Sequence, residues 1–139
     1  MESKTIFEKI IAGEIPSYKI WEDEKHYAFL DISPFAPGHT LVVPKKPSPY
    51  IFDLEESEYT ELLLAAKKVA KKLKSAIATP RVGVVVAGFG VVDHVHVHLI
   101  PIHSEGELLG GPQKISKEEM EKIHQKIQKE IADPGYVGV

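Results

Sequence analysis

The sequence predicts an α+β fold in which a mostly antiparallel sheet is combined with three helices. The first observation is the order of the expected elements, which runs helix, three strands, helix, two strands, helix. Strands that cluster in this way form hairpins rather than parallel crossovers. The second is length, because 139 residues without a repeat or linker correspond to one domain over residues 1–139. The third is composition, which is globular at 43% hydrophobic and 27% charged residues.

The N-terminal residues predict a short helix followed by two strands. In TIFEKIIAG the apolar residues recur at helical spacing, and Gly13 is the expected stop. The segments YKIWED and HYAFLDI then have the pattern of strands joined by a polar turn around Glu24 and Lys25. The buried face of the short helix is expected to consist of Ile6, Phe7, Ile10 and Ile11.

A loop, a third strand and a long helix follow. SPFAPG is broken by two prolines and a glycine, and HTLVVP has the pattern of a strand that ends at Pro44. The long helix is expected from about Leu54 to Ile77, with Asp53 as its N-cap and Glu56 completing a capping-box pattern. Its lysines mostly occupy the face opposite its apolar stripe, which is typical of a solvated helix face. The stripe consists of Leu62, Leu63, Ala66, Val69, Ala70, Leu73 and Ile77.

The C-terminal part predicts two strands and a further helix. RVGVVVAG is so apolar that we expect a strand in the centre of the sheet, and HVHVHLI is the strand after it. SKEEMEKIHQKIQKEIAD is the third helix, in which Ser116 and Glu119 form a capping box. The buried stripe of this helix is expected to consist of Met120, Ile123, Ile127 and Ile131.

Charge and composition argue against several classes of protein. A net charge of −3 does not favour a general nucleic-acid or membrane-surface binder. No apolar run approaches the length of about 18 residues that a membrane span needs. The sequence has no cysteine, which excludes disulfides and thiolate metal sites. Because MESKTIFEKIIAGEIP also lacks the apolar stretch of a signal peptide, we expect a cytoplasmic protein that binds neither nucleic acid nor membrane.

Three histidines alternate with apolar residues in DHVHVHLIP. Side chains alternate between the faces of a strand, so His94, His96 and His98 share one face, with neighbouring rings about 6–7 Å apart. Three explanations are open: a row of exposed histidines, a transition-metal site, or acid–base and nucleophilic chemistry. Metal sites usually recruit carboxylates or thiolates as well, and Asp93 points off the histidine face. We therefore favour the third explanation.

Three imidazoles on one strand can divide the steps of a phosphoryl-transfer reaction between them. A neutral ring can attack phosphorus and form a covalent intermediate. Protonated neighbours can stabilise the charged oxygens and protonate the leaving group. Acid–base assistance alone contributes about 10²–10⁴ in rate.

These motifs resemble one known family. HVHVHLI matches His-φ-His-φ-His-φ-φ, where φ is hydrophobic, which is the signature of the histidine triad (HIT) superfamily of nucleotide hydrolases and transferases. The segment IFEKIIAGEIPSYKIWEDEKHYAFLDISPFAPGHTLVVPKK also resembles the N-terminal half of that family. The similarity covers most of residues 5–46 and 81–102. It implies a five-stranded antiparallel sheet with helices, in a homodimer joined through the long helix and a neighbouring strand.

The resemblance implies a role for each histidine of the motif. His96 matches the nucleophile that takes a nucleoside monophosphate onto its ring, and His98 matches the residue that contacts the phosphate and assists the leaving group. His94 matches the first triad histidine, which supports the others by hydrogen bonds. His39, in PGHTLVVP, matches a fourth histidine of the same network.

The resemblance also implies a nucleotide-binding site. Asp31 matches the acid that holds the ribose hydroxyls of a purine nucleotide. The loop before the triad is short and has Gly90 and Val91 where relatives carry Gln and Ser or Thr, so the backbone N–H groups of Gly88 and Gly90 are candidate phosphate donors. Residues that match the wall around the base, although apolar residues at this spacing also form simple core, are Ile6, Phe7, Ile10, Phe29, Leu30 and Ile32.

The sequence departs from the zinc-containing relatives that it resembles. Those proteins carry cysteines at the positions of Thr5 and Glu8 and a histidine at the position of Pro47. Only His94 remains of that set, so we expect no structural zinc and no cofactor.

Four features outside the motif receive no catalytic role. His26 and His124 are expected at the surface, and no role is assigned to His103. The C-terminal PGYVGV either reaches toward a dimer partner's site or is a frayed end.

The function that these residues predict is hydrolysis of phosphoramidate or phosphoanhydride bonds of a purine nucleoside monophosphate, without metal, through a nucleotidyl-His96 intermediate. A diadenosine polyphosphate hydrolase would use the same chemistry. A protein that binds nucleotides or a regulatory partner with weak catalysis is the alternative from another class.

Overall fold

The computed structural model describes residues 4–88 and 92–132, together with the side chains of all of these except 131 and 132. It confirms the α+β class, because a five-stranded antiparallel sheet combines with three helices in the expected order. No helix in the described ranges is long and apolar enough to cross a membrane. The elements are α1 (Ile6–Ile11), β1 (Lys19–Glu22), β2 (His26–Leu30), β3 (Thr40–Pro44), η1 (Ile51–Asp53), α2 (Glu56–Ile77), β4 (Arg81–Ala87), β5 (His96–Ile102), η2 (Glu105–Leu109) and α3 (Lys117–Ala132).

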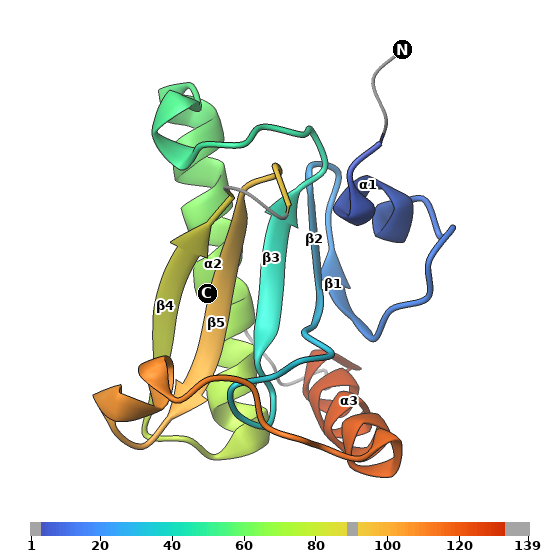
Figure 1. Ribbon diagram of the computed structural model, residues 1–139, viewed down its shortest axis with the longest axis vertical. Helices are drawn as coiled ribbons and strands as arrows, with labels where there is room; N and C mark the ends of the chain where they lie inside the picture. The colour runs from blue at the N-terminus through green and yellow to red at the C-terminus, as the bar shows by residue number, and fades with distance from the viewer. Residues whose placement is uncertain (1–3, 89–91, 133–139) are drawn as a thin grey trace.

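The sheet has the strand order β1-β2-β3-β5-β4, and every neighbouring pair is antiparallel (Figure 1). The helix α2 lies behind the sheet in this view, whereas α1 lies near the opposite face beside β1 and β2. The largest core cluster fills the space between the sheet and α2, with α3 closing its side. Its fully buried members include Leu62, Val69, Leu73, Val97 and Leu99.

A second, smaller apolar cluster lies on the opposite face of the sheet, against α1. It combines Phe7 and Ile10 of α1 with four residues of β2 and β3. Thr5 caps α1 as its N-cap residue: its side chain accepts the Glu8 N–H, and the Glu8 carboxylate accepts the Thr5 N–H. This capping box offsets the low stability of a six-residue helix and fixes α1 against the sheet.

The strand β4 lies at the edge of the sheet, so the prediction of a central strand is wrong. Its three consecutive valines are 55%, 41% and 38% exposed at Val84, Val85 and Val86. A continuous apolar run is typical of a strand covered on both faces, and the run alone does not say whether the cover comes from the same chain. In this chain the run is an exposed apolar edge.

The start of α2 also differs from the prediction. Asp53 belongs to the short helix η1, whose N–H groups bond back to Tyr50 and Ile51, and α2 begins at Glu56. Glu58 accepts the Glu55 N–H at 3.2 Å and closes the cap instead. In α3 the predicted cap is present in part, because the Ser116 hydroxyl accepts the Glu119 N–H at 3.1 Å.

The predicted apolar stripes of α2 and α3 face the core with one addition. Met120 and Ile127 are buried and Ile123 packs partly against the core, while the side chain of Ile131 lies outside the described part. Lys72 is buried as well, although the other lysines of α2 are exposed, and burial lowers the pKa of its ammonium group.

Candidate active site

The triad histidines lie on the face of the sheet that also carries α1. His98 pairs with Leu41 in the β3–β5 ladder, and Leu41 belongs to the cluster against α1. Val97 and Leu99 point the other way and are almost completely buried under α2. The alternation of side chains along the strand therefore places the histidines on one face of the sheet and the buried apolar residues on the other, as the sequence predicts. His94 comes just before β5, and its ring is fully buried.

Both nitrogens of the His94 ring have protein partners. Nε2 lies 2.7 Å from the carbonyl oxygen of Pro44, which can only accept, so Nε2 carries a proton. Burial lowers the pKa of His94, which favours the neutral ring with a single proton. Nδ1 therefore accepts, and the Thr5 hydroxyl donates to it at 2.8 Å.

The His96 ring is oriented by the backbone of His94. Its Nδ1 lies 2.8 Å from the His94 carbonyl oxygen, so Nδ1–H donates and Nε2 keeps its lone pair. Burial also lowers the pKa of His96, which keeps that lone pair available at neutral pH. The Phe7 ring packs edge-on against His96 and His94 at centroid distances of 5.0 Å and 5.5 Å and restricts both rings.

His98 and His39 form a second chain of hydrogen bonds. The Phe35 N–H donates to His39 Nδ1 at 2.9 Å, so the proton of the neutral His39 ring lies on Nε2. This proton points to His98 Nδ1, 2.9 Å away. The tautomer of His98 follows, with its own proton on Nε2. Burial lowers the pKa of His98 to about 4, and the neighbouring His96 and His39 act in the same direction.

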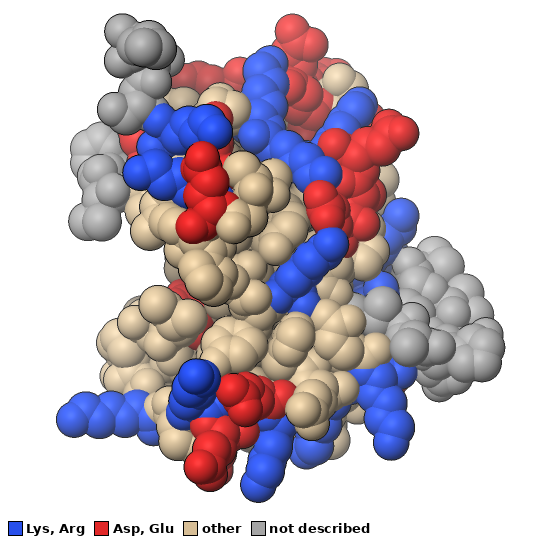
Figure 2. Space-filling model, turned by 90° about the vertical axis from the view of Figure 1, so that its right-hand side faces the viewer, with Lys and Arg blue, Asp and Glu red and all other residues tan. Residues whose placement is uncertain are grey.

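Burial thus favours neutral rings at all four positions, since the pKa of His39 is lowered by burial as well, against the opposing charge of Asp31. The left-hand edge of Figure 2 shows this face of the sheet in profile, and it is hollowed at mid-height. The site therefore consists of neutral, hydrogen-bonded imidazoles.

Asp31 lies beside this chain. Its Oδ2 is 3.6 Å from His39 Nε2, and its Oδ1 accepts the Ser33 N–H at 2.8 Å. Among the described residues, Asp31, His39 and His98 offer ligand atoms within 4.8 Å of one another, close enough to hold a metal ion. His94 and His96 are not in this group. The direct hydrogen bond between His39 and His98 accounts for their proximity.

The predicted apolar wall is divided by the structure into three parts. Phe7, Ile10 and Phe29 are on the histidine face but buried in the cluster against α1. Ile6 and Ile32 are exposed, at 47% and 79%.

The prediction that Leu30 lines the nucleotide site is wrong. Its side chain is 2% exposed and belongs to the core under α2. Because Phe29 and Leu30 are consecutive in a strand, their side chains point to opposite faces.

Gly88 has a packing reason for lacking a side chain. A Cβ there would lie 2.3 Å from the Pro49 carbonyl oxygen and 2.9 Å from Val95 Cα. This close approach holds the segment before the triad against the segment after β3, where Val95 N–H donates to the Ser48 carbonyl. Gly90, the second glycine expected to bind phosphate, lies outside the described residues.

The residues at the zinc positions of the family do not fit a zinc ion. The Thr5 hydroxyl and the Pro44 carbonyl satisfy both nitrogens of His94, and Pro47 has no side-chain donor. The Glu8 carboxylate accepts the Thr5 N–H. Thr5, Glu8 and His94 form a hydrogen-bonded joint between α1 and the triad.

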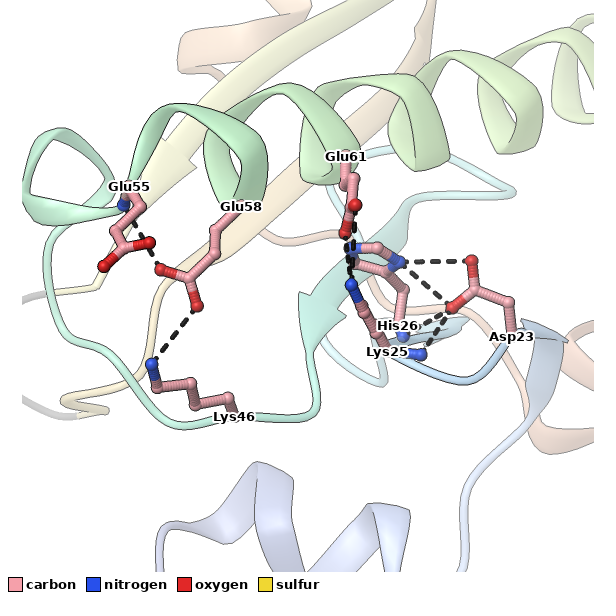
Figure 3. A network of polar contacts seen from close by, with 7 residues as sticks. All are labelled: Asp23, Lys25, His26, Lys46, Glu55, Glu58 and Glu61. Carbon is pink, nitrogen blue, oxygen red and sulfur yellow. Dashed lines mark hydrogen bonds and ion pairs between the residues drawn. The ribbon is translucent and has the colours of Figure 1, made fainter.

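His26, expected at the surface, is 5% exposed and was therefore misplaced. Its Nδ1–H donates to the Asp23 carboxylate at 3.0 Å, within the network of polar contacts that ties the β1–β2 turn to α2 (Figure 3). Lys25 pairs with Glu61 in that network. His124, also expected at the surface, is half-buried and donates to the Lys19 carbonyl at 2.7 Å.

Sequence reasoning missed two partners of the triad, namely the Thr5 hydroxyl and the Pro44 carbonyl. Thr5 stands immediately before the helical pattern and three residues before Glu8, so a capping box was recognisable there. The hydrogen bond from Thr5 to the His94 ring, 89 residues away, could not be recognised from the sequence.

Fold and site together define a class of protein: an antiparallel sheet that carries a histidine triad at the start of its fifth strand and just before it. The HIT domain family model matches residues 12–105, and the chain belongs to this family. An adenosine 5′-monophosphoramidase from Candida albicans is 38% identical over an alignment that covers 91% of both chains. The corresponding protein of Saccharomyces cerevisiae is 36% identical, covering 91% of this chain and 82% of its own.

Solved structures agree with this assignment. A HIT-like protein from Bartonella henselae, described as involved in cell-cycle regulation, has a TM-score of 0.76 and 36% identity over 92% of this chain and 97% of its own. A histidine triad nucleotide-binding protein from Candida albicans has a TM-score of 0.61 and 35% identity over 93% and 98% of the two chains.

Proposed function

We propose that this protein is a nucleotide hydrolase of the phosphoramidase type, which cleaves the P–N bond of a purine nucleoside phosphoramidate. The observation that carries the proposal is the tautomer of His96, whose Nδ1–H is held by the His94 carbonyl. This leaves a neutral Nε2 lone pair on a ring that burial keeps unprotonated. Two of the relatives above carry the name adenosine 5′-monophosphoramidase, which supports this substrate class.

The first step is attack of His96 Nε2 on phosphorus. A P–Nε2 bond forms, the P–N bond of the substrate breaks, and the amine leaves with that electron pair. The amine takes up a proton through the region of His98, whose remaining donor is its Nε2–H. The positive charge that develops on the His96 ring is stabilised by the His94 carbonyl 2.8 Å from Nδ1.

The second step is hydrolysis of the nucleotidyl-His96 intermediate. Water attacks phosphorus, the P–Nε2 bond breaks, and its electron pair returns to Nε2. The proton that water loses replaces the one taken up by the amine, so the site returns to its starting protonation state. In this proposal Asp31, which lies beside His39, accepts hydrogen bonds from the ribose hydroxyls, and the exposed Ile6 and Ile32 contact the base.

The decisive experiment measures AMP released from adenosine 5′-phosphoramidate in excess EDTA. We expect turnover by the wild type and a loss of at least about 10³-fold in His96→Ala, because no other group replaces a covalent nucleophile. His103→Ala is the matched control, since that ring is 71% exposed and outside the site. Full AMP release by His96→Ala would disprove the mechanism, and EDTA-sensitive turnover would contradict metal independence.

We also propose that two copies form a homodimer through β4 and α2. Val84 and Val86, which share one face of β4, and the neighbouring Leu63 of α2 offer an apolar surface that a second copy could cover. The cavity next to it has a volume of about 740 Å³ and includes Tyr50, Phe52 and Val86 in its lining. The reaction belongs in the cytoplasm on this proposal, which a sequence without cysteine supports.

A further inference from the structure

The Thr5 hydroxyl uses its hydrogen and one of its lone pairs in two different bonds. Its oxygen accepts the Glu8 N–H at 3.1 Å and thereby caps α1. Its hydrogen is donated to His94 Nδ1 at 2.8 Å, because the Pro44 carbonyl fixes the single proton of that ring on Nε2. One half-buried side chain therefore joins the start of α1 to a fully buried ring that is 89 residues away in sequence.

The residue that Thr5 binds, His94, also makes the hydrogen bond that orients the nucleophile His96. The His94 ring is held by Thr5 and Pro44, and the carbonyl of the same residue accepts Nδ1–H of His96. Only this arrangement leaves the His96 lone pair on Nε2. The next residue, Val95, is bound through its N–H to the Ser48 carbonyl, so the segment has few other ways to relax.

We propose that Thr5 is a positioning residue for the reaction: through His94 it fixes the orientation and tautomer of His96. This inference rests on the proposed function for its kinetic consequence. It extends the site to the N-terminal helix, which contributes the Phe7 ring against His94 and His96 as well. A residue that only capped α1 would affect the stability of the fold and leave the state of the His94 ring unchanged.

Three substitutions separate the cap from the donor. Thr5→Ser keeps both bonds. Thr5→Asp keeps a good N-cap acceptor for the Glu8 N–H but has no hydrogen to donate, so the carboxylate draws a proton onto His94 Nδ1. Thr5→Val keeps the size and loses both bonds. Ser116→Ala, which removes a cap of α3 outside the site, is the matched control for lost capping alone.

The experiment measures steady-state AMP release from adenosine 5′-phosphoramidate and the ¹⁵N signals of the His94 ring by NMR. We expect Thr5→Asp and Thr5→Val to lower kcat about tenfold or more, as slight misplacement of a reacting group does. Thr5→Ser and Ser116→Ala should retain the wild-type kcat. In Thr5→Asp the His94 signals should show protonation of Nδ1 at neutral pH.

A Thr5→Asp variant with wild-type kcat and an unchanged His94 ring would overturn the inference and leave Thr5 as a helix cap. The NMR measurement needs no turnover, so it separates this inference from the proposed function. If the wild type released no AMP, the proposed function would fail, whereas the His94 signals would still show whether Thr5 sets the state of that ring.

Discussion

At the scale of single residues, the site is defined by where each imidazole proton lies. Carbonyl and amide groups of the backbone settle the tautomers, because the Pro44 and His94 carbonyls only accept and the Phe35 N–H only donates. Once these backbone groups fix one ring nitrogen, the position of the proton on each neighbouring ring is determined as well. Burial does the rest, since it lowers the pKa of each ring and favours the neutral form that nucleophilic attack requires.

Neutral buried histidines make the stability of the fold depend on pH. The pKa of His98 is about 4 in the folded chain and 6.5 ordinarily, so the unfolded chain binds the proton first on acidification. The contribution is complete above pH 6.5 and is lost as the pH falls toward 4. It amounts to at most about 2 kcal/mol, because water around this half-buried ring screens part of the effect.

His98→Asn tests this pH dependence, because Asn can still accept from His39 but does not titrate. We expect the free energy of unfolding in urea to fall less between pH 7 and pH 4.5 in the variant than in the wild type, by up to about 2 kcal/mol. Identical pH dependence of the two proteins would show that His98 is not a neutral buried ring.

Sequence reasoning found the residues of the site more easily than their partners. The alternation of HVHVHLI is local, so it predicts which side chains share a face before any tertiary contact is known. The same alternation separates Phe29 from Leu30 and could have excluded Leu30 from the histidine face. The bond from Thr5 to His94 depends on how α1 packs on the sheet, and no local pattern contains that information.

At the scale of elements, the triad strand is held by close contact between neighbouring segments. The segments after β3 and before β5 meet at Gly88, where there is no room for a methyl group. This steric reason differs from the phosphate-binding role that the sequence predicts for Gly88. Both roles depend on the backbone, but only the steric one acts in the free protein.

Gly88→Ala is therefore expected to destabilise the chain without any ligand. A Cβ 2.3 Å from the Pro49 carbonyl oxygen forces the backbone to shift, which should cost about 1–3 kcal/mol in the free energy of unfolding. Gly106→Ala is the matched control, since its nearest atom would be 3.9 Å away. Wild-type stability of Gly88→Ala would leave phosphate binding as the reason for the glycine.

At the scale of the whole molecule, the sheet ends in an apolar edge. The sequence predicts the number and type of the elements, and the structure confirms them, because periodicity and capping are encoded within each segment. It does not predict the position of β4, because RVGVVVA is equally apolar whether its cover comes from the same chain or from another. The proposed homodimer supplies that second source.

Val84→Glu tests the proposed homodimer. Placing a charge on a 55%-exposed residue of β4 should leave the monomer folded but shift the mass measured by sedimentation from dimer to monomer. Leu109→Glu changes an equally apolar residue that is 90% exposed and outside the β4–α2 surface, and it should not alter the mass. A wild type that sediments as a monomer at micromolar concentration would refute the homodimer.

The exposed edge of β4 also affects how readily a chain aggregates before a second copy covers that edge. The seven residues of β4 include four valines, no proline and a single charge at Arg81, which resembles the segments that stack into fibrils. An unpaired edge of this composition is a template for such growth. If the proposed homodimer covers this edge, chains that have not yet paired are the ones most prone to aggregate.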